Sequence, residues 1–268
     1  MIVAQISDLH IQGRTGETRN KSFDEFVALE RCVAQINTFP YPIDLVIATG
    51  DLVQRGRARE YEPLKEALSA LKSPYVLLPG NHDERTALRS TFENPGYFRD
   101  PEFLHFELDE FPVRILGLDT LKVGSHGAEF CPKRLDWIAK RLGEKRDKPT
   151  LIAMHHPPFP SGLPHFDRLG FEGLDEFARI VASAPQVERL ICGHIHRSIS
   201  VKFAGTAGTV APATCYLYEL ALEDPGAFIA TREPPAFQVH VWTGEMLLTH
   251  TIPVGPFFER ELQFAAKP

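Results

Sequence analysis

The N-terminal segment Met1-Ile-Val-Ala-Gln-Ile-Ser-Asp8-Leu-His10 combines a short apolar run with two polar side chains that follow it directly. The apolar part has the length of a buried strand, and Asp8 and His10 stand two positions apart. Because side chains two apart on an extended backbone point the same way, the carboxylate and the imidazole can converge on one ion. The segment therefore predicts a strand with a pair of ligands at its carboxyl end.

Four further apolar runs end in polar clusters of the same kind. These clusters are Gly50-Asp51, Gly80-Asn81-His82-Asp83, His155-His156-Pro157-Pro158 and Gly193-His194-Ile195-His196. In open α/β sheets the ligand crevice lies outside the carboxyl ends of the strands, so we expect all five clusters at one edge. A single Asp-x-His or His-x-His is also compatible with a cap or a turn. The five together match the ligands of hard and borderline metal ions and predict a metal site.

Apolar runs of strand length alternate with amphipathic helical stretches over residues 1–197, which predicts an α/β sheet covered by helices. After about residue 198 the helical period disappears, and apolar runs separated by Pro and Gly predict strands. We expect one domain over residues 1–268, with a core at 1–197 and a β-rich C-terminal extension at 198–268. The predicted helices are 22–37, 59–71, 132–142 and 172–183, with Ser22 as N-cap of the first, and Asp83 is expected to cap a helix at 84–91. The predicted strands are 2–7, 44–49, 75–78, 114–118, 150–154 and 189–192, followed by 201–203, 209–211, 215–221, 237–242 and 246–251.

The composition indicates an ordinary globular protein. Of the 268 residues, 43% are hydrophobic and 24% are charged, which argues against disorder and coiled coil. The net charge of -6 disfavours binding to a nucleic-acid polymer. The four cysteines form no CxxC pair, and no apolar run reaches the roughly 18 residues of a membrane helix. We expect a cytoplasmic protein without a signal peptide or a membrane segment.

In residue type and order, the five clusters resemble the five-block signature of the calcineurin-like metallophosphoesterases. The blocks span residues 8–196, and the resemblance implies a four-layer α/β/β/α sandwich. The segment Gly50-Asp51-Leu52…Gly56…Glu60-Tyr61 and the ending Gly193-His194-x-His196 resemble those of bacterial class III cyclic-nucleotide phosphodiesterases and glycerophosphodiesterases. Gln54, where many relatives carry an acid, and the absence of a histidine from 213–218 are departures that concern the substrate.

The resemblance also implies a ligand set for two divalent ions. Asp8, His10 and His196 would hold the first ion, Asn81, His155 and His194 the second, and Asp51 would bridge them. No thiolate is among the seven, so Mn or Fe is expected, with Zn or Co also compatible. Two cations ~3.5–4 Å apart can lower the pKa of a bridging water and clamp the oxygens of an in-line phosphoryl displacement. The attacking group would then be a metal-bridging hydroxide, and no side-chain nucleophile is required.

Residues beside the ligands are assigned to the substrate. His82 resembles the histidine that assists the leaving group in this family, with a purely structural role as the alternative. The polar loop 12–21 carries Arg14 and Arg19, either of which could contact the substrate or only face solvent. His156 neighbours a ligand and is assigned to the substrate edge or to support of the ligands.

The function that these residues predict is hydrolysis of small phosphodiesters by a binuclear metal-dependent phosphodiesterase, with 3′,5′-cyclic nucleotides such as cAMP as first candidates. A glycerophosphodiesterase of the same family is the alternative. A nuclease or protein phosphatase of the superfamily, and a non-catalytic scaffold on the same fold, are further readings; the complete ligand set and His82 argue against the scaffold. We also expect a homo-oligomer, a dimer or higher, because exposed β-edges often pair.

Overall fold

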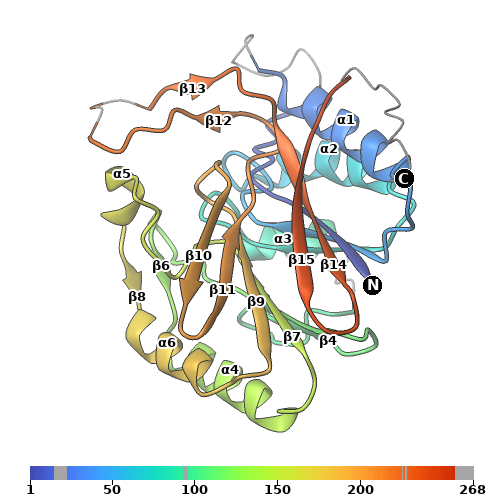
Figure 1. Ribbon diagram of the computed structural model, residues 1–268. Helices are drawn as coiled ribbons and strands as arrows, with labels where there is room; N and C mark the ends of the chain where they lie inside the picture. Colours follow the sequence, from blue (N-terminus) through green and yellow to red (C-terminus); the bar gives the residue numbers. More distant parts are fainter. Residues whose placement is uncertain (15–22, 93–95, 225, 227, 257–268) are drawn as a thin grey trace, which may run out of the picture.

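Two β-sheets lie at the centre of the molecule, with helices on both outer sides (Figure 1). The computed structural model describes residues 1–14, 23–92, 96–224, 226 and 228–256. The helices are α1 Glu25–Asn37, α2 Ala58–Ser69, α3 Arg85–Thr91, α4 Pro132–Glu144, α5 Pro164–Asp167 and α6 Leu174–Ala182. The strands are β1 Ile2–Ile6, β2 Leu45–Thr49, β3 Tyr75–Leu78, β4 Phe106–Leu108, β5 Arg114–Leu118, β6 Ala128–Glu129, β7 Thr150–Met154, β8 Phe171–Glu172, β9 Val187–Cys192, β10 Ile199–Phe203, β11 Thr206–Val210, β12 Leu217–Tyr218, β13 Ala230–Thr231, β14 Ala236–Trp242 and β15 Leu247–Pro253.

The strand order explains how polar clusters far apart in sequence reach one edge. The first sheet runs β15-β14-β1-β2-β3 and the second runs β10-β11-β9-β7-β5-β4. Strands β1, β2 and β3 are parallel to one another, as are β5, β7, β9 and β11. The carboxyl ends of neighbouring parallel strands lie at the same edge, so the residues that follow them can meet.

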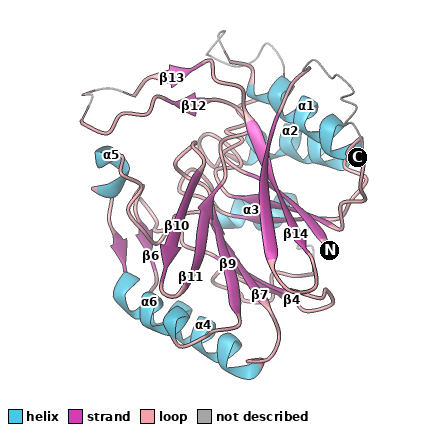
Figure 2. Ribbon diagram, viewed as in Figure 1, coloured by secondary structure: helices cyan, strands magenta, loops and turns pink. Residues whose placement is uncertain are grey.

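Separate apolar cores fix the helices to the two sheets. Helices α1, α2 and α3 pack on the first sheet through side chains such as Leu29, Leu64 and Leu88. Helices α4 and α6 pack on the second sheet through Ile138 and Phe177 (Figure 2). Burial of these apolar faces is the main force that holds the layers together. The predicted α/β/β/α sandwich is thereby confirmed.

The C-terminal strands complete the two sheets. Strands β10 and β11 extend the second sheet, whereas β14 pairs antiparallel with β1 and carries β15 at the edge of the first. Strands β12 and β13 form a separate two-stranded arm that projects from the body in Figure 1. The β character predicted for residues 198–268 is therefore present in the described part of this segment.

Asp24 and Glu84 cap the N-termini of helices α1 and α3. Helix α1 begins at Glu25, with the Asp24 carboxylate accepting the Val27 amide at 3.1 Å, and Ser22 lies outside the described residues. The assignment of Asp83 as the cap of α3 is wrong. Glu84 caps that helix by accepting the amides of Thr86 and Ala87, at 3.0 and 2.7 Å. The Asp83 side chain instead turns inward, where its carboxylate accepts hydrogen bonds from the amides of Leu52, Val53 and Gly80 and from the Tyr61 hydroxyl.

Within the described residues, no helix is long and apolar enough to cross a membrane.

Candidate metal centre

The polar residues after β1, β2, β3, β7 and β9 meet where the carboxyl edges of the two sheets adjoin. The Asp8 amide bonds the Gly50 carbonyl at 3.0 Å, and the His10 amide bonds the Asp51 carbonyl at 2.9 Å. On the second sheet, the Gly193 amide bonds the carbonyl of His155 at 2.9 Å. These backbone bonds join each strand end to the next. The five sequence clusters therefore meet at one place in the structure.

The backbone at this edge is strained. Among the described residues, six that are not glycine have a positive φ, and only Ala204 lies elsewhere. Such a conformation is uncommon for residues with a Cβ, and it persists where the surrounding structure holds it in place, often at functional sites. The five at the site are Asp8 (54°), His10 (49°), Asp51 (49°), His194 (74°) and His196 (60°).

Two glycines allow the strand ends to approach this closely. A Cβ at position 80 would lie 2.2 Å from Oδ1 of Asp51, and a Cβ at position 193 would lie 1.9 Å from Oγ of Ser7. Neither separation is possible for real atoms, so Gly80 and Gly193 are required by packing. The glycines of the sequence motifs thus permit the convergence of the polar side chains.

Asp8, His10 and His196 form one half of the site, and all three are buried. Their ligand atoms lie within 4.8 Å of one another, with 3.0 Å between Nε2 of His10 and Nε2 of His196. Nδ1 of His196 donates to the Tyr216 carbonyl at 2.8 Å, which leaves Nε2 facing Oδ1 of Asp8 at 3.6 Å. A carbonyl acceptor behind an imidazole is the usual way to orient a histidine that binds a metal.

His155 is held in the same way in the other half of the site. Its Nδ1 donates to the Thr49 carbonyl at 2.8 Å, and its Nε2 lies 3.4 Å from Oδ1 of Asp51 and 3.2 Å from Oδ1 of Asn81. Its ring centroid is 5.1 Å from that of His194. The structure therefore places Asn81 and His194 beside His155, the three residues that the family resemblance assigns to a second ion.

Asp51 lies between these two halves. Its Oδ2 is 3.7 Å from Nε2 of His10, and its Oδ1 accepts the His82 amide at 2.9 Å. It belongs with Asp8 and His155 to one cluster of close ligand atoms and with His10 and His82 to another. A carboxylate with two oxygens in this position can face two cations at once.

Burial shifts the protonation of nearly every group in the site. Desolvation raises the pKa of Asp8 to about 7, with the charge of Asp51 adding to the effect. Desolvation lowers the pKa of His10 to about 4, and holds those of His194 and His196 well below the usual range. Ionisation of these buried groups costs free energy unless an opposite charge lies nearby.

Asp51 and His155 form the one strongly favoured charge pair among these buried groups. Burial alone would raise the pKa of Asp51, but the charge and hydrogen bond of His155 hold it well below normal. Burial likewise opposes a charged His155, and Asp51 overcomes this and raises its pKa to about 9. When no metal ion is bound, Nε2 of His155 therefore carries a proton. This proton faces Oδ1 of Asp51 and Oδ1 of Asn81, in the space that a cation could occupy.

The donor set fits divalent transition metals. The free lone pairs on Nε2 of His10 and Nε2 of His196 face carboxylate oxygens at 3.7 and 3.6 Å. Lone pairs that face one another repel unless a proton or a cation lies between them. Imidazole and carboxylate without thiolate suit Mn, Fe, Co and Zn alike.

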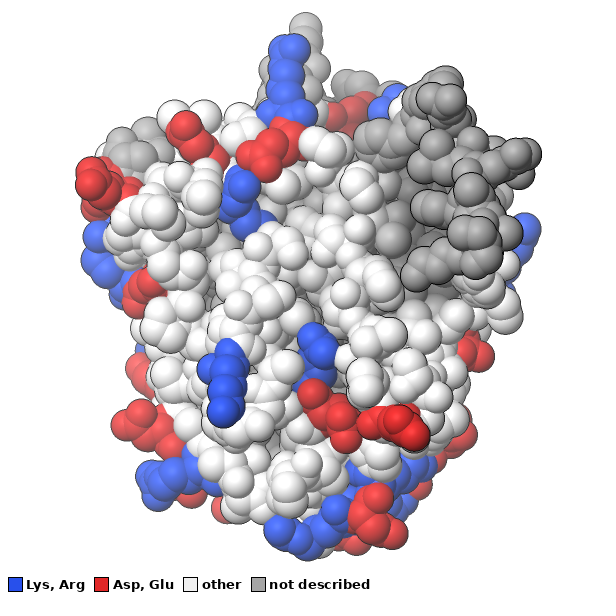
Figure 3. Space-filling model, in the orientation of Figure 1, with Lys and Arg blue, Asp and Glu red and all other residues white. Residues whose placement is uncertain are grey.

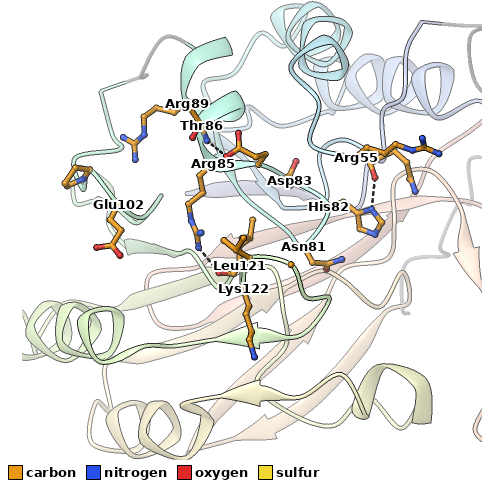
Figure 4. A pocket seen from close by; sticks show the side chains of 15 residues that line it. Arg55, Asn81, His82, Asp83, Arg85, Thr86, Arg89, Glu102, Leu121 and Lys122 are labelled. Atoms are coloured by element: carbon orange, nitrogen blue, oxygen red, sulfur yellow. Dashed lines mark hydrogen bonds between the residues drawn. The ribbon is translucent and has the colours of Figure 1, made fainter.

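His82 borders the centre and is partly exposed. Its Nδ1 donates to the Gln54 carbonyl at 2.8 Å (Figure 4). Its Nε2 therefore turns toward Oδ2 of Asp51, at 3.9 Å. Its ring lies edge-on to that of His10, with the centroids 4.9 Å apart. His82 can therefore reach a molecule held at the centre while its own ring is oriented by the protein.

The other residues assigned to the substrate lie in different surroundings. His156 is buried, and its Nδ1 pairs with the Thr120 hydroxyl at 2.8 Å. Arg14 is exposed and forms an ion pair with Glu66 of α2 at 2.7 Å. Arg19 lies outside the described residues. Of these three, His156 is the one that the structure places beside the candidate ligands.

His126 borders the centre although it belongs to none of the five sequence clusters. It lies in the loop before β6, and its Nδ1 accepts a hydrogen bond from Nδ2 of Asn81 at 2.8 Å. This bond turns Oδ1 of Asn81 toward His155. Its ring also lies 5.3 Å from that of His82. No motif marks an isolated loop histidine, so its contact could be found only from the fold.

Asp119 was also missed, although it directly follows β5 as the ligands follow their strands. Its buried carboxylate accepts Nε and Nη2 of Arg85 at 2.6 and 2.9 Å and the Leu104 amide at 2.9 Å. Asp83 has a comparable role, because it accepts the amides of Leu52 and Gly80 and the Tyr61 hydroxyl, at 3.1, 2.8 and 2.9 Å. Both carboxylates hold the loops that carry the centre.

Known proteins with a similar sequence or fold include phosphodiesterases and a dimetal phosphatase. Residues 1–198 match the calcineurin-like phosphoesterase family. The chain is 34% identical over 259 residues to a protein of Arcobacter nitrofigilis named "Probable glycerophosphodiester phosphodiesterase GpdQ", covering 96% of this chain and 94% of that one. It is 28% identical to the 3′,5′-cyclic adenosine monophosphate phosphodiesterase CpdA of Escherichia coli K12, over 81% and 77% of the two chains. A dimetal phosphatase from Danio rerio has a similar structure, with a TM-score of 0.68 at 15% identity over 95% and 99% of the two chains.

Proposed function

This chain belongs to the calcineurin-like phosphoesterase family, and on that premise we propose that it is a hydrolase of small phosphodiesters that works with two divalent metal ions. The observation that carries the proposal is the convergence of buried carboxylates and oriented imidazoles at one strained sheet edge. Relatives named as phosphodiesterases that align over most of the chain support the choice of diesters.

The geometry supports a specific division of the ligands. Asp8, His10 and His196 would hold one ion, and Asn81, His155 and His194 the other, with Asp51 between them. When bound, the two cations would supply an activated water and charge stabilisation for the phosphoryl oxygens. The Tyr216 and Thr49 carbonyls orient two of the imidazoles, and His126 orients the Asn81 amide.

His82 is proposed to act on the leaving group. The Gln54 carbonyl fixes its Nδ1, and the opposite nitrogen faces the centre. From there it can hydrogen-bond the oxygen that separates from phosphorus and deliver a proton to it. Buried His156 borders the same space and is proposed to contact the substrate or to support His194, whose ring centroid is 4.6 Å away.

Two substrate classes are supported by relatives, namely 3′,5′-cyclic nucleotides and glycerophosphodiesters. A polymeric nucleic acid is not proposed. On the face shown in Figure 3, basic and acidic side chains are interspersed around a broad uncharged area, and the described residues form no continuous basic track there. A track of that kind is what a polyanion requires.

The test is a substrate panel on metal-reconstituted enzyme. We expect kcat/KM for bis(p-nitrophenyl) phosphate to exceed that for p-nitrophenyl phosphate at the same pH and metal. Cyclic AMP and glycerophosphodiesters in the same panel assign the substrate class, and Mn, Fe, Co and Zn compared at equal occupancy assign the metal. A preference for the monoester would contradict the proposal, and absence of any hydrolysis with two ions bound would favour a scaffold.

Location and assembly are part of the same proposal. All four cysteines are free, which is consistent with a reducing compartment such as the cytoplasm. A homo-oligomer is supported by the exposed apolar side chains of the β12–β13 arm, Leu220, Leu222, Phe228 and Ile229. Light scattering on the purified protein tests the assembly.

A further inference from the structure

Two cavities that border the candidate metal centre differ in size and in chemistry. The first, here called the His82 cavity, has a volume of about 680 Å³ and is bordered by Asn81 and His82 (Figure 4). Its far wall comes from the start of α3 and from the loop after β5, including Thr86 and Leu121. A space of this size is typical of sites for complete small ligands.

The second, here called the His194 cavity, has a volume of about 150 Å³. It is bordered by His156 and His194, and most of its remaining wall is apolar, with Phe166 and Leu174 among the lining side chains. The loop that carries His126 separates the two spaces, because Gly124 lines the first and Gly127 lines the second. A molecule held at the metal centre therefore has a wide polar space on one side and a narrow apolar space on the other.

Charges on the wall of the His82 cavity make it suitable for a polar group. Arg85 is neutralised by Asp119, and Lys122 pairs with Glu172. Among the described residues the guanidinium of Arg55 has no ion-pair partner. Within the part of the chain that the structure describes, the hydrogen bonds of the Arg89 guanidinium go only to the carbonyls of residues 98, 100 and 103. Donors of this kind can bind hydroxyl, carbonyl or anionic groups of a ligand.

We propose that the His82 cavity is the leaving-group subsite and that it takes the larger, hydroxyl-bearing alcohol of an unsymmetrical acyclic phosphodiester. The smaller substituent then faces the His194 cavity. This inference rests on the proposed function, because it needs a diester at the centre. It follows from the position of His82, which borders the larger space and not the smaller one.

The reaction at such a substrate is a hydrolysis of one phosphorus–oxygen bond. The oxygen of a water molecule forms a bond to phosphorus, and the bond from phosphorus to the alcohol in the His82 cavity breaks. One proton of that water remains on the phosphate product or is lost to solvent, and the departing oxygen receives a proton through His82. The products are the larger alcohol and the phosphate monoester of the smaller substituent.

The experiment uses methyl thymidine-5′-yl phosphate, whose two alcohols are of similar acidity but very different size. We expect thymidine and methyl phosphate as the main products, exceeding thymidine 5′-monophosphate and methanol by about tenfold or more, a discrimination within the usual range for a shaped pocket. Hydrolysis in ¹⁸O-water with mass spectrometry of the products verifies attack at phosphorus. Equal amounts of the two product pairs, or an excess of thymidine 5′-monophosphate, would overturn the inference while leaving the proposed function intact.

A pair of variants tests the cavity itself. Thr86 is exposed at the start of α3 and lines the cavity, so Thr86→Trp places an indole within it. Ser90→Trp, an exposed position on the same helix that does not line the cavity, is the matched control. Thr86→Trp is expected to lower kcat/KM on methyl thymidine-5′-yl phosphate by about tenfold, but to change that on ethyl methyl phosphate, whose two alcohols are both small, by much less.

Metal content, measured by elemental analysis, should remain at two per chain in both variants. An equal loss on the two substrates, or an unchanged product ratio in a correctly folded Thr86→Trp enzyme, would overturn the assignment of this cavity. If the wild type hydrolyses neither bond of any diester, the proposed function fails, and the inference fails with it.

Discussion

The molecule contains two buried regions whose polar groups find their partners in different ways. Between the sheets, Nε2 of His240 donates to the side-chain oxygen Oε1 of Gln5 at 3.0 Å, and its Nδ1 pairs with the Thr249 hydroxyl at 2.8 Å. Nε2 of Gln5 donates to the Thr49 hydroxyl and to the Cys192 carbonyl, both at 2.9 Å. At the sheet edge, by contrast, ring nitrogens face carboxylates and one another. Buried polar groups normally find partners within the protein. At the edge, Nε2 of His10 and Nε2 of His196 face each other at 3.0 Å and gain a favourable partner only when a cation or a proton lies between them, and this difference identifies the edge as a binding site.

The largest effect is expected when the shared carboxylate of the edge is neutralised. Asp51→Asn removes the charge that faces both halves, so two cations would repel each other without compensation. We expect a loss of metal from at least one position and a fall in kcat/KM on bis(p-nitrophenyl) phosphate by roughly 10³-fold or more. Asp136→Asn, at an exposed carboxylate on α4, is the control. Two bound ions and full activity in Asp51→Asn would show that Asp51 is not the shared ligand.

His82 tests whether chemistry and metal binding can be separated at this edge. His82→Ala should keep two ions per chain, and should lower kcat by roughly 10²–10⁴-fold on substrates with poor leaving groups, such as glycerophosphodiesters. The loss on bis(p-nitrophenyl) phosphate should be much smaller, because p-nitrophenolate leaves without a proton. An equal loss on both substrates would mean that His82 stabilises transition-state charge instead, and loss of one ion would make it a ligand.

Asp119 borders the site, but its carboxylate finds its hydrogen-bond partners within the protein, as the polar groups between the sheets do. Its carboxylate is buried, and Arg85 together with backbone amides outweighs the effect of burial and holds its pKa below the ordinary value. Asp119→Asn leaves the Arg85 charge without its partner, so we expect roughly 3–5 kcal/mol less unfolding free energy in urea denaturation. The exposed pair of Lys133 and Glu102 is the comparison, and Glu102→Gln should lower the unfolding free energy far less than Asp119→Asn does, because solvent screens an exposed pair. Equal effects of the two variants would refute this account of Asp119.

The smallest expected effect concerns pH and the region between the sheets. Burial lowers the pKa of His240 from 6.5 to about 3, so the folded protein binds this proton less readily than the unfolded chain. The stability contribution is complete above pH 6.5 and is lost as the pH falls toward 3, at about 1.4 kcal/mol per pH unit. The unfolding free energies of wild type and His240→Gln, measured by urea denaturation between pH 7.5 and 5, isolate the pH dependence that His240 causes. Identical pH slopes in the two proteins would contradict it.

Sequence reasoning succeeded where a local pattern encodes the structure. The apolar runs before Asp8, Asp51, Asn81, His155 and His194 predicted strands β1, β2, β3, β7 and β9 to within two residues at each end. The seven candidate ligands converge because each lies within four residues of the carboxyl end of one of these strands. Short strands such as β6 and β8 were missed, since two residues carry no period and their pairing depends on the fold.

The remaining parts of the site depend on contacts between distant segments. His126 and Asn81 are 45 residues apart, and no local pattern relates them. Asp83 precedes a helix and has the chemistry of a cap, but its carboxylate is held by Tyr61, Leu52 and Gly80, so Glu84 caps α3 instead. The cavities also depend on loop conformations. These features follow from packing, which the linear sequence does not display.

The most direct test is anomalous diffraction from crystals of the Mn-reconstituted protein. We predict two anomalous peaks per chain, one at coordination distance from Asp8, His10 and His196 and the other from Asn81, His155 and His194, with Asp51 in contact with both. A single peak, or peaks bonded to other residues while these lone pairs stay unliganded, would contradict the claim that two ions complete the polar edge.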